Sequence, residues 1–162
     1  MSNVLVELSN AMAAAAEKAG DSTVMVNARR RMPASGIAYS ADLILTADHV
    51  VEREDGITVT LGDGTEIAAT LAGRDPGTDL ALLRLERGDA KPATTTDTSK
   101  IGQLVLALGR PSTEGIEASL GVVSDSWSYN EFGEVTAYTA TANAAPVYEV
   151  SYTLDDLGRI AQ

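Results

Sequence analysis

Short runs of β-branched and aliphatic residues, separated by glycine and aspartate, dominate the sequence from Asp21 onward. In the first part of the chain these runs are Thr23–Ala28, Ser35–Tyr39, Leu43–Thr46, Ile57–Leu61, Glu66–Ala72 and Leu80–Leu85. Between two of them, Gly62-Asp63-Gly64 favours a tight hairpin. Because no helical pattern alternates with the runs, they predict an all-β barrel or sandwich instead of a sheet with crossover helices.

A second group of strands follows a polar stretch, Gly88–Lys100, which is rich in threonine and aspartate. A polar stretch of this length predicts a linker. Beyond it, strands are expected at Gln103–Leu108, Glu117–Ser124 and Glu134–Ala140. The chain is therefore expected to hold two β-rich parts joined by one linker.

The first twenty residues have a different pattern, with apolar residues at helical spacing and a glycine stop at Gly20. The apolar positions are Val4, Leu5, Leu8, Met12 and Ala15. They predict an amphipathic helix over residues 2–19 that docks on the main body or on a partner. A helix lying on a membrane surface would need basic residues on its polar face, and only Lys18 is available.

The same segment is not expected to be a secretory signal peptide, because it lacks a positively charged start and Glu7 interrupts its apolar stretch. No run of about 18 apolar residues occurs in the sequence, which argues against a membrane span. The compartment stays undetermined from these observations, with a cytoplasmic location slightly favoured.

Composition excludes several kinds of site and partner. The chain has 23 Asp and Glu against 12 Lys and Arg, and this net charge of −11 disfavours nucleic acid and anionic membranes as partners. The absence of cysteine excludes disulfides, thiolate metal sites and a cysteine nucleophile, and a single histidine leaves no room for a histidine-rich metal site. The one basic cluster, Arg29-Arg30-Arg31, is interpreted as a solvated loop, with anion binding as the alternative.

Three segments in order carry a resemblance to a known family. Ser35–Val51 reads SGIAYSADLILTADHVV, Gly73–Leu85 reads GRDPGTDLALLRL, and Gly102–Pro111 reads GQLVLALGRP, with SLGVVS following at Ser119–Ser124. In kind, order and spacing, these segments resemble the HtrA-type branch of the trypsin-like serine proteases. The resemblance covers roughly two thirds of the chain.

The resemblance implies a chymotrypsin/trypsin-like double β-barrel with an N-terminal α-helix. It divides the chain into an N-terminal helix at residues 1–20, a first β-barrel at 21–90 and a partial second β-barrel at 101–162. The implied activity is that of a serine endopeptidase, a hydrolase. Such an enzyme needs no cofactor and no metal, because side chains and backbone donors carry out the hydrolysis.

His49 and Asp79 are the candidate general base and its orienting acid. A serine hydroxyl needs a neighbouring base to take its proton, and imidazole suits this task near neutral pH. His49 follows one apolar run and Asp79 opens another, so each backbone is anchored at a strand end. By resemblance, Asp79 would hold the His49 ring in the correct tautomer. Asp48 and Asp75 compete as acidic neighbours, but the context TDLALL selects Asp79.

The nucleophile segment departs from the family. The family pattern G-N-S-G-G-P is absent, and the nearest alignment, Val147–Leu154, puts Ser151 at the nucleophile position. Glu149 stands where a glycine donates its N–H to the oxyanion, and Tyr152 and Thr153 replace small residues. Since loss of one oxyanion donor costs on the order of a hundred- to a thousandfold in rate, impaired peptidase activity is expected.

Few residues follow Ser151, whereas the family continues for further strands that close the second barrel. The sequence therefore predicts a truncated product, a copy with a remodelled end, or a barrel completed by another chain. Because an uncovered apolar sheet edge is a liability in solution, a homo-oligomer or a partner chain is expected to cover it.

Three functions fit these observations. The leading one is a protease-fold binding or assembly subunit, a pseudoprotease that keeps His49 and Asp79 but has a degenerate nucleophile loop. The second is an active serine endopeptidase that uses Ser151 as its nucleophile. The third is an assembly component whose open barrel edge pairs with a neighbour. In each case the expected partner is a protein or a peptide.

Overall fold

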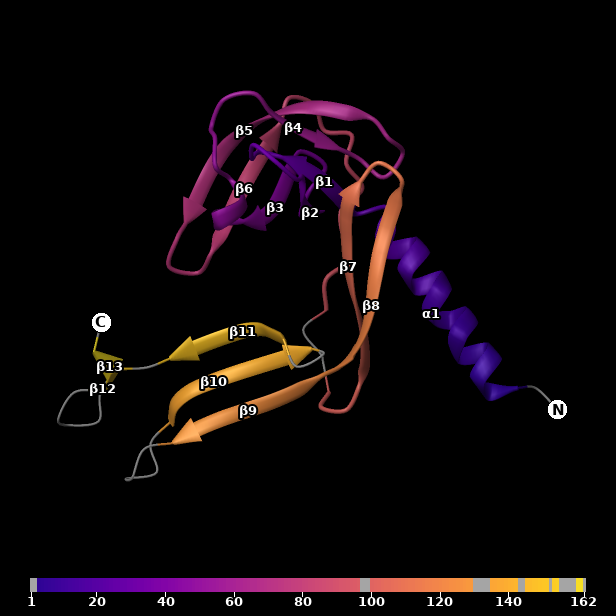
Figure 1. The fold of residues 1–162 in the computed structure, drawn as a ribbon, viewed down its shortest axis with the longest axis vertical. Helices are drawn as coiled ribbons and strands as arrows, with labels where there is room; N and C mark the ends of the chain where they lie inside the picture. Colours follow the sequence, from indigo (N-terminus) through magenta and orange to yellow (C-terminus); the bar gives the residue numbers. More distant parts are fainter. Residues whose placement is uncertain are drawn as a thin grey trace. The chain divides into compact units, whose positions relative to one another are not determined.

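A computed structural model describes residues 3–96, 100–129, 135–142, 145–151, 153–154 and 160–161, with side chains up to Ser124. The chain divides into two compact units. The first comprises Met1–Thr95 and Leu108–Ala118, and the second comprises Thr96–Ala107 and Ser119–Gln162. The first unit holds a helix, a closed barrel and the end of a hairpin, and the second holds small open sheets (Figure 1).

The N-terminal helix α1 spans Val4–Gly20 and begins at Asn3, whose side chain accepts a hydrogen bond from the Leu5 N–H. Its apolar side chains do not pack along the barrel: Val4 is 72% and Leu5 74% exposed, and only Gly20 is buried. Of the two expected docking sites, contact with the main body is limited to the end of the helix, and docking on a partner stays a prediction. At its last turn the helix meets the rest of the first unit, where Gly20 lies against Ile116, and its earlier turns extend away from the barrel (Figure 1).

Six antiparallel strands form the closed barrel, in the order β1-β2-β3-β6-β5-β4. They are β1 (Thr23–Asn27), β2 (Ala34–Ala38), β3 (Leu43–Ala47), β4 (Ile57–Thr60), β5 (Glu66–Asp75) and β6 (Leu80–Leu85). The all-β barrel expected for the first part of the sequence is thus confirmed. The clearest difference lies in β5, which passes the expected end at Ala72 and reaches Asp75 after an irregularity in register between Leu71 and Gly73.

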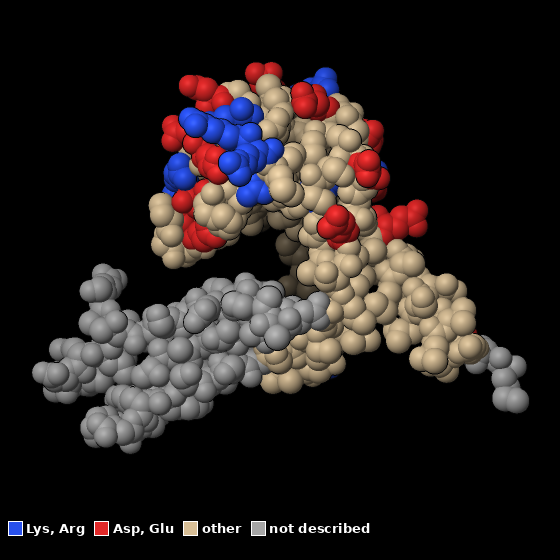
Figure 2. All heavy atoms as spheres, in the orientation of Figure 1, with Lys and Arg blue, Asp and Glu red and all other residues tan. Residues whose placement is uncertain are grey.

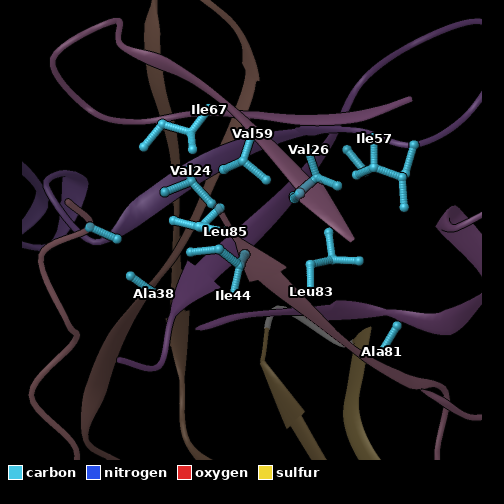
Figure 3. Close-up of a cluster of buried hydrophobic side chains, with 14 of the residues drawn as sticks. Val24, Val26, Ala38, Ile44, Ile57, Val59, Ile67, Ala81, Leu83 and Leu85 are labelled. Carbon is cyan, nitrogen blue, oxygen red and sulfur yellow. The ribbon is translucent and has the colours of Figure 1, made fainter. Parts of the chain in front are cut away.

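The interior of the barrel is filled by alternate aliphatic residues of these strands (Figure 3). The largest fully buried side chains are Ile44, Ile57, Leu83, Val24, Val26 and Val59. Burial of each such side chain contributes about 1.5–3 kcal/mol relative to exposure. Ile44 of β3 and Leu83 of β6 are paired across the ladder, and their burial fixes the two strands. The segments that follow β3 and precede β6 are therefore held in place.

The hairpin of β7 (Leu104–Ser112) and β8 (Gly115–Val122) is fixed to the first unit through Arg110. Arg110 is buried, and its guanidinium donates to the Thr23 carbonyl at 2.7 Å and to the Gly20 carbonyl at 2.9 Å. Its backbone N–H donates to the Ser35 hydroxyl at 2.8 Å. A single residue therefore joins the hairpin to the end of α1 and to the first two strands.

The second unit contains a three-stranded antiparallel sheet in the order β11-β10-β9. Its strands are β9 (Ser124–Tyr129), β10 (Val135–Ala142) and β11 (Ala145–Ser151). A two-stranded ladder joins β12 (Thr153–Leu154) to β13 (Ile160–Ala161). Within its described residues this unit is a partial sheet structure and not a closed barrel, in agreement with the expected fold class.

The basic cluster lies in the loop between β1 and β2. The Arg29 guanidinium donates to the carbonyls of Met32 and Pro33 in its own loop, and Glu52 accepts from the Arg30 N–H. Figure 2 shows basic and acidic side chains side by side on the visible face of the first unit. These contacts support the interpretation of the cluster as a solvated loop. In the described part of the chain, no helix has both the length and the apolar character needed to cross a membrane.

Candidate active site

His49 lies on a 3₁₀ turn, Asp48–Val50, that follows β3 directly. The turn is anchored on both sides, because Thr46 in β3 donates its hydroxyl to the Ser35 carbonyl at 2.8 Å and Val51 is buried beyond the turn. The side chain of His49 itself is 68% exposed. A rigid backbone thus presents an accessible imidazole.

Asp79 closes the loop between β5 and β6 and has a φ of +55°, in the left-handed region. Aspartate tolerates this region better than most residues, at a cost of about 1–2 kcal/mol. Asp75 shapes the loop before it, since its carboxylate accepts from the Gly77 N–H at 3.0 Å and from the Thr78 hydroxyl at 2.8 Å. These donors, the Thr78 hydroxyl first, hold the pKa of Asp75 below its ordinary value.

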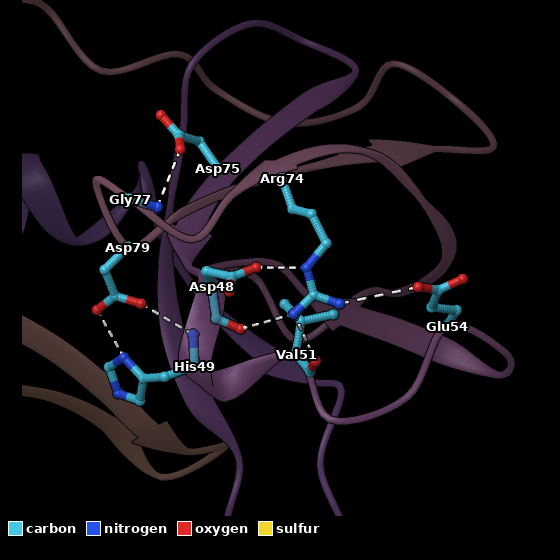
Figure 4. Close-up of polar contacts among 8 residues, drawn as sticks. All are labelled: Asp48, His49, Val51, Glu54, Arg74, Asp75, Gly77 and Asp79. Atoms are coloured by element: carbon cyan, nitrogen blue, oxygen red, sulfur yellow. Dashed lines mark hydrogen bonds and ion pairs between the residues drawn. The ribbon is translucent and has the colours of Figure 1, made fainter. Parts of the chain in front are cut away.

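Asp79 makes three hydrogen bonds to the turn that carries His49 (Figure 4). Its Oδ1 accepts from the His49 N–H at 2.9 Å, and its Oδ2 lies 2.6 Å from His49 Nδ1. Its backbone carbonyl accepts from the Asp48 N–H at 3.0 Å. The backbone N–H of His49, and next its ring, lower the pKa of Asp79, so the carboxylate stays ionised near neutral pH.

Nε2 of His49, the ring nitrogen that does not contact Asp79, has no partner among the described residues and can act as an acceptor. With the proton on Nδ1 donated to Asp79, Nε2 carries the lone pair that would take a proton from a hydroxyl nucleophile. The three candidate acids have separate partners: Asp79 binds His49, Asp48 binds Arg74, and Asp75 caps its own loop. The geometry therefore brings His49 and Asp79 together, as the sequence context predicts.

Ser151 is the last residue of β11 and belongs to the second unit. Its backbone pairs with Ala137, and that of Glu149 pairs with Thr139, both in β10. The side chains of Ser151 and Glu149, and the whole of Tyr152, lie outside the described residues. The role of Ser151 thus stays a prediction, and the first unit by itself contains His49 and Asp79.

One residue with a bearing on the site escapes sequence reasoning. Arg74 contacts the His49 turn from the side opposite Asp79, although the sequence segment that contains it suggests a role only for Asp79. Its partner Asp48 lies 26 positions away, and only the extension of β5 to Asp75 brings the two together. In the described ranges, no group of three or more His, Cys, Asp and Glu side chains is placed to hold a metal ion.

The sequence also matches known proteins. The profile described as "Trypsin-like peptidase domain" matches residues 34–154. A "Probable periplasmic serine endoprotease DegP-like" of Marinomonas sp. (strain MWYL1) is 42% identical over 93 residues, which are 56% of this chain and 20% of that protein. A "Probable periplasmic serine protease do/HhoA-like" of Haemophilus influenzae is 34% identical over 127 residues, 68% of this chain and 26% of that protein. The chain thus spans about a fifth to a quarter of the length of these relatives.

Solved structures have a similar fold. The crystal structure of Deg5 superposes with a TM-score of 0.66 at 23% identity, covering 95% of this chain and 83% of that one. The serine endoprotease from Yersinia pestis superposes with a TM-score of 0.64 at 26% identity, covering 90% of this chain and 54% of that one. Both likenesses agree with the trypsin-like fold expected from the sequence.

The relatives also correct one expectation. The sequence slightly favours a cytoplasmic location, and this is wrong, because the matched relatives are named periplasmic proteins. The favoured location rested on the composition of the first twenty residues, which carries no information about where a β-rich protease fold works. Since the peptidase profile covers more than half of the sequence and the matched relatives are DegP-like and HhoA-like proteins, the chain belongs to the trypsin-like serine protease family, in its HtrA-type branch.

Proposed function

We propose that this chain is a protease-fold binding or assembly subunit that retains the His49–Asp79 pair but hydrolyses peptide bonds weakly or not at all. The observation that carries the proposal is the backbone of β11. The residues aligned with the nucleophile segment, Glu149 and Ser151, are paired with β10 in a regular antiparallel ladder. A serine protease needs the backbone N–H groups of this segment to converge on one oxygen.

The physical reason lies in the oxyanion hole. Its two N–H donors belong to the nucleophile and to the residue two positions earlier, and both must reach one oxygen at about 2.7–3.1 Å. Such donors lie at most about 6 Å apart. Along an antiparallel strand, residues two positions apart are separated by about 6.8 Å. The N–H groups of Glu149 and Ser151 in an extended strand are therefore too far apart to share one oxyanion.

Charge adds to this disadvantage. Glu149 replaces the glycine of the family pattern, and a carboxylate beside the developing oxyanion opposes the negative charge of the transition state. The expected loss is on the order of a hundred- to a thousandfold in rate for one missing donor, and more for the whole loop. The partner that such a subunit binds is a protein or a peptide, and the homologous proteases act on the same class of molecule.

A second candidate, an active serine endopeptidase with Ser151 as nucleophile, is favoured by the His49–Asp79 contact. Nδ1 of His49 and Oδ2 of Asp79 lie 2.6 Å apart, which is the geometry that a general base needs. In this case a rearrangement of β11, or completion by a partner chain, would create the missing donors.

A fluorophosphonate probe separates the two candidates. The full chain, a His49→Ala variant and a Ser151→Ala variant are incubated with the probe beside an unrelated active serine protease as a positive control. If the chain binds its partner without catalysis, the probe labels only the control protease. Stoichiometric labelling of the chain that disappears in both variants, together with cleavage of an unfolded substrate, would overturn the leading proposal and establish the endopeptidase.

The assembly role is tested by light scattering on the full chain at micromolar concentration. A subunit that pairs with a neighbour is expected to form a defined oligomer, or to form one when its partner is added. A stable monomer that binds neither itself nor an unfolded polypeptide contradicts the binding and assembly role.

A further inference from the structure

We propose that Arg74 is a positioning residue for His49, acting through Asp48 as a clamp on the face of the turn opposite Asp79. The inference rests on the His49–Asp79 pair that the proposed function retains. It concerns the backbone turn Asp48–Val50, because the orientation of the imidazole depends on where this short turn is held. Figure 4 shows Arg74 and Asp79 on opposite sides of the turn.

Three contacts join the Arg74 guanidinium to the turn. Nε donates to the Asp48 carboxylate at 2.5 Å, and Nη2 donates to the backbone carbonyls of Asp48 at 3.5 Å and Val51 at 3.4 Å. The same Asp48 carbonyl accepts the N–H of Val51 at 3.0 Å, which closes the turn. The guanidinium thus contacts both the first residue of the turn and the residue after it, and it spans the position of His49.

The contact between Arg74 and Asp48 is important because the Asp48 carboxylate is buried. Asp48 is only 9% exposed, and a buried carboxylate is costly unless it is paired. The Arg74 side chain is 35% exposed and reaches the carboxylate from the end of β5. Oε1 of Glu54 lies 3.7 Å from Nη1 of Arg74, and Glu54 is itself exposed, so this ion pair adds little to the stability of the contact. The principal partner of Arg74 is therefore the residue that precedes His49.

Arg74 and Asp79 come from the two ends of one loop. Arg74 lies next to the last residue of β5, and Asp79 immediately precedes β6. The loop between them is stiffened by Asp75, which binds Gly77 and Thr78. One stiff loop therefore contacts the turn on both faces. Loss of Arg74 would remove the contact on one face of the turn and allow the turn to shift relative to Asp79, which weakens the bond between His49 Nδ1 and Asp79 Oδ2.

The requirement is for arginine and not for any cation. Several N–H groups in a planar fork are needed to reach a carboxylate and two carbonyls at once, and a lysine ammonium is a compact point charge. Arg74→Lys is therefore expected to keep the charge balance of Asp48 but to lose the contact with Val51. This separates positioning from simple charge compensation.

The single histidine of the sequence makes a direct test feasible. Ring ¹⁵N shifts of the full-length protein, labelled at histidine, report which nitrogen of His49 carries the proton, and they need no catalytic activity. At about pH 9, where an unperturbed imidazole is neutral, the wild type is expected to hold the proton on Nδ1, facing Asp79. Asp79→Asn is expected to return the ratio to that of free imidazole.

Arg74→Gln is expected to move the tautomer ratio about threefold or more toward that of free imidazole, and Arg74→Lys to move it part of the way. Arg84→Gln is the matched control, because Arg84 pairs with Asp42 at 2.6 Å on an exposed surface of the same hairpin and does not contact the turn. It should leave the ratio unchanged. If Arg74→Gln does not fold, Arg74→Lys and Asp48→Asn decide the question.

A wild-type preference for Nδ1 that is lost in Asp79→Asn but kept in folded Arg74→Gln or Arg74→Lys would overturn the positioning role alone. A shift in unfolding temperature without a shift in tautomer would do the same, since it would show a merely structural arginine. A wild type with the ratio of free imidazole, unchanged in Asp79→Asn, would instead refute the His49–Asp79 pair and with it the role of Arg74.

Discussion

Asp79 combines a left-handed backbone with three hydrogen bonds to the turn that carries His49. The cost of the conformation is offset by these bonds, two of which are made by the short carboxylate side chain and one by the backbone carbonyl. An asparagine could adopt the same backbone but would lose the negative charge. An aspartate is therefore needed at this position for its charged side chain and not for its backbone preference.

The pH dependence of this contact can be predicted in sign. His49 lowers the pKa of Asp79, first through its backbone N–H and then through its ring, so the folded state binds the carboxylate proton more weakly than the unfolded state. The resulting stability is fully present above the unfolded value of about 3.9 and is lost as pH falls through the lower, folded pKa. The difference in free energy of unfolding between wild type and Asp79→Asn should therefore shrink at acidic pH in urea titrations.

His49→Gln provides the control for this prediction. The variant keeps the backbone N–H, which is the larger cause of the lowered pKa, and loses the ring. Its pH dependence should be reduced but not abolished. A difference between wild type and Asp79→Asn that is the same at neutral and acidic pH would contradict the account.

The sequence predicts the His49–Asp79 pair because each residue stands in a distinctive local context beside a strand. It does not predict Arg74–Asp48, because that contact depends on two parts of the fold that no local pattern connects. Asp48 appears from the sequence as a competitor for the role of Asp79, whereas the structure turns its buried carboxylate the other way, into an ion pair with Arg74. A contact of this kind is fixed by the path of the barrel strands.

Strand β2 passes close to its neighbours at Gly36, and this is the element on which the placement of β3 depends. A Cβ at Gly36 would lie 2.8 Å from Cγ2 of Ile44, 2.9 Å from Cγ2 of Val26 and 3.1 Å from the Leu45 carbonyl oxygen. The first two atoms belong to the packed core and the third to backbone, so none can move freely. The sequence shows Gly36 only as part of the S-G-I pattern. The structure shows why a glycine stands there: a side chain would collide with its neighbours.

Gly36→Ala is expected to destabilise the protein by about 1–3 kcal/mol through overpacking. Gly73→Ala in β5 is the matched control, because no atom lies within 4 Å of its would-be Cβ. This substitution should change the free energy of unfolding by no more than about 0.5 kcal/mol. The measurement is urea unfolding of the full chain. Equal effects of the two substitutions would refute the steric explanation.

Strand β11 contains residues that the resemblance aligns with the nucleophile segment. The aligned segment, Val147–Leu154, overlaps β11, which spans Ala145–Ser151. Its alternating Val147, Glu149 and Ser151 fit a strand with period two, and Pro146 is tolerated because β11 lies at the edge of its sheet. The local pattern thus agrees with a strand, and the role of Ser151 as nucleophile stays a prediction.

At the scale of the whole chain, the first β-rich part follows from its sequence more closely than the second. Aliphatic alternation with glycine and aspartate turns is sufficient to predict a barrel, because each strand must bury one face. The segment after Ser119 has weaker alternation, and its expected strand Glu117–Ser124 is divided in the structure between β8 and β9. The helix is predicted in place, but its exposed apolar side chains are not.

Arg110 links several elements of the first unit, since its hydrogen bonds reach the end of α1, the start of β1 and β2. The guanidinium faces the carbonyl end of the helix, where the helix dipole is negative and favours a cation. Arg110→Met would leave the Gly20 and Thr23 carbonyls buried without their donor, and is expected to cost about 3 kcal/mol. Arg87→Met, which removes an exposed ion pair with Asp89, should cost less than about 1 kcal/mol.

Hydrogen exchange shows whether this loss is local or global. If Arg110 joins the helix to the barrel, the amides of the last turn of α1 and of β1 should lose protection together in Arg110→Met, because both depend on the same guanidinium. Arg87→Met should change neither. Loss of protection confined to the hairpin of β7 and β8, with α1 and β1 unaffected, would mean that the hairpin needs Arg110 but the helix and barrel do not. The first unit would then be held together by its core alone.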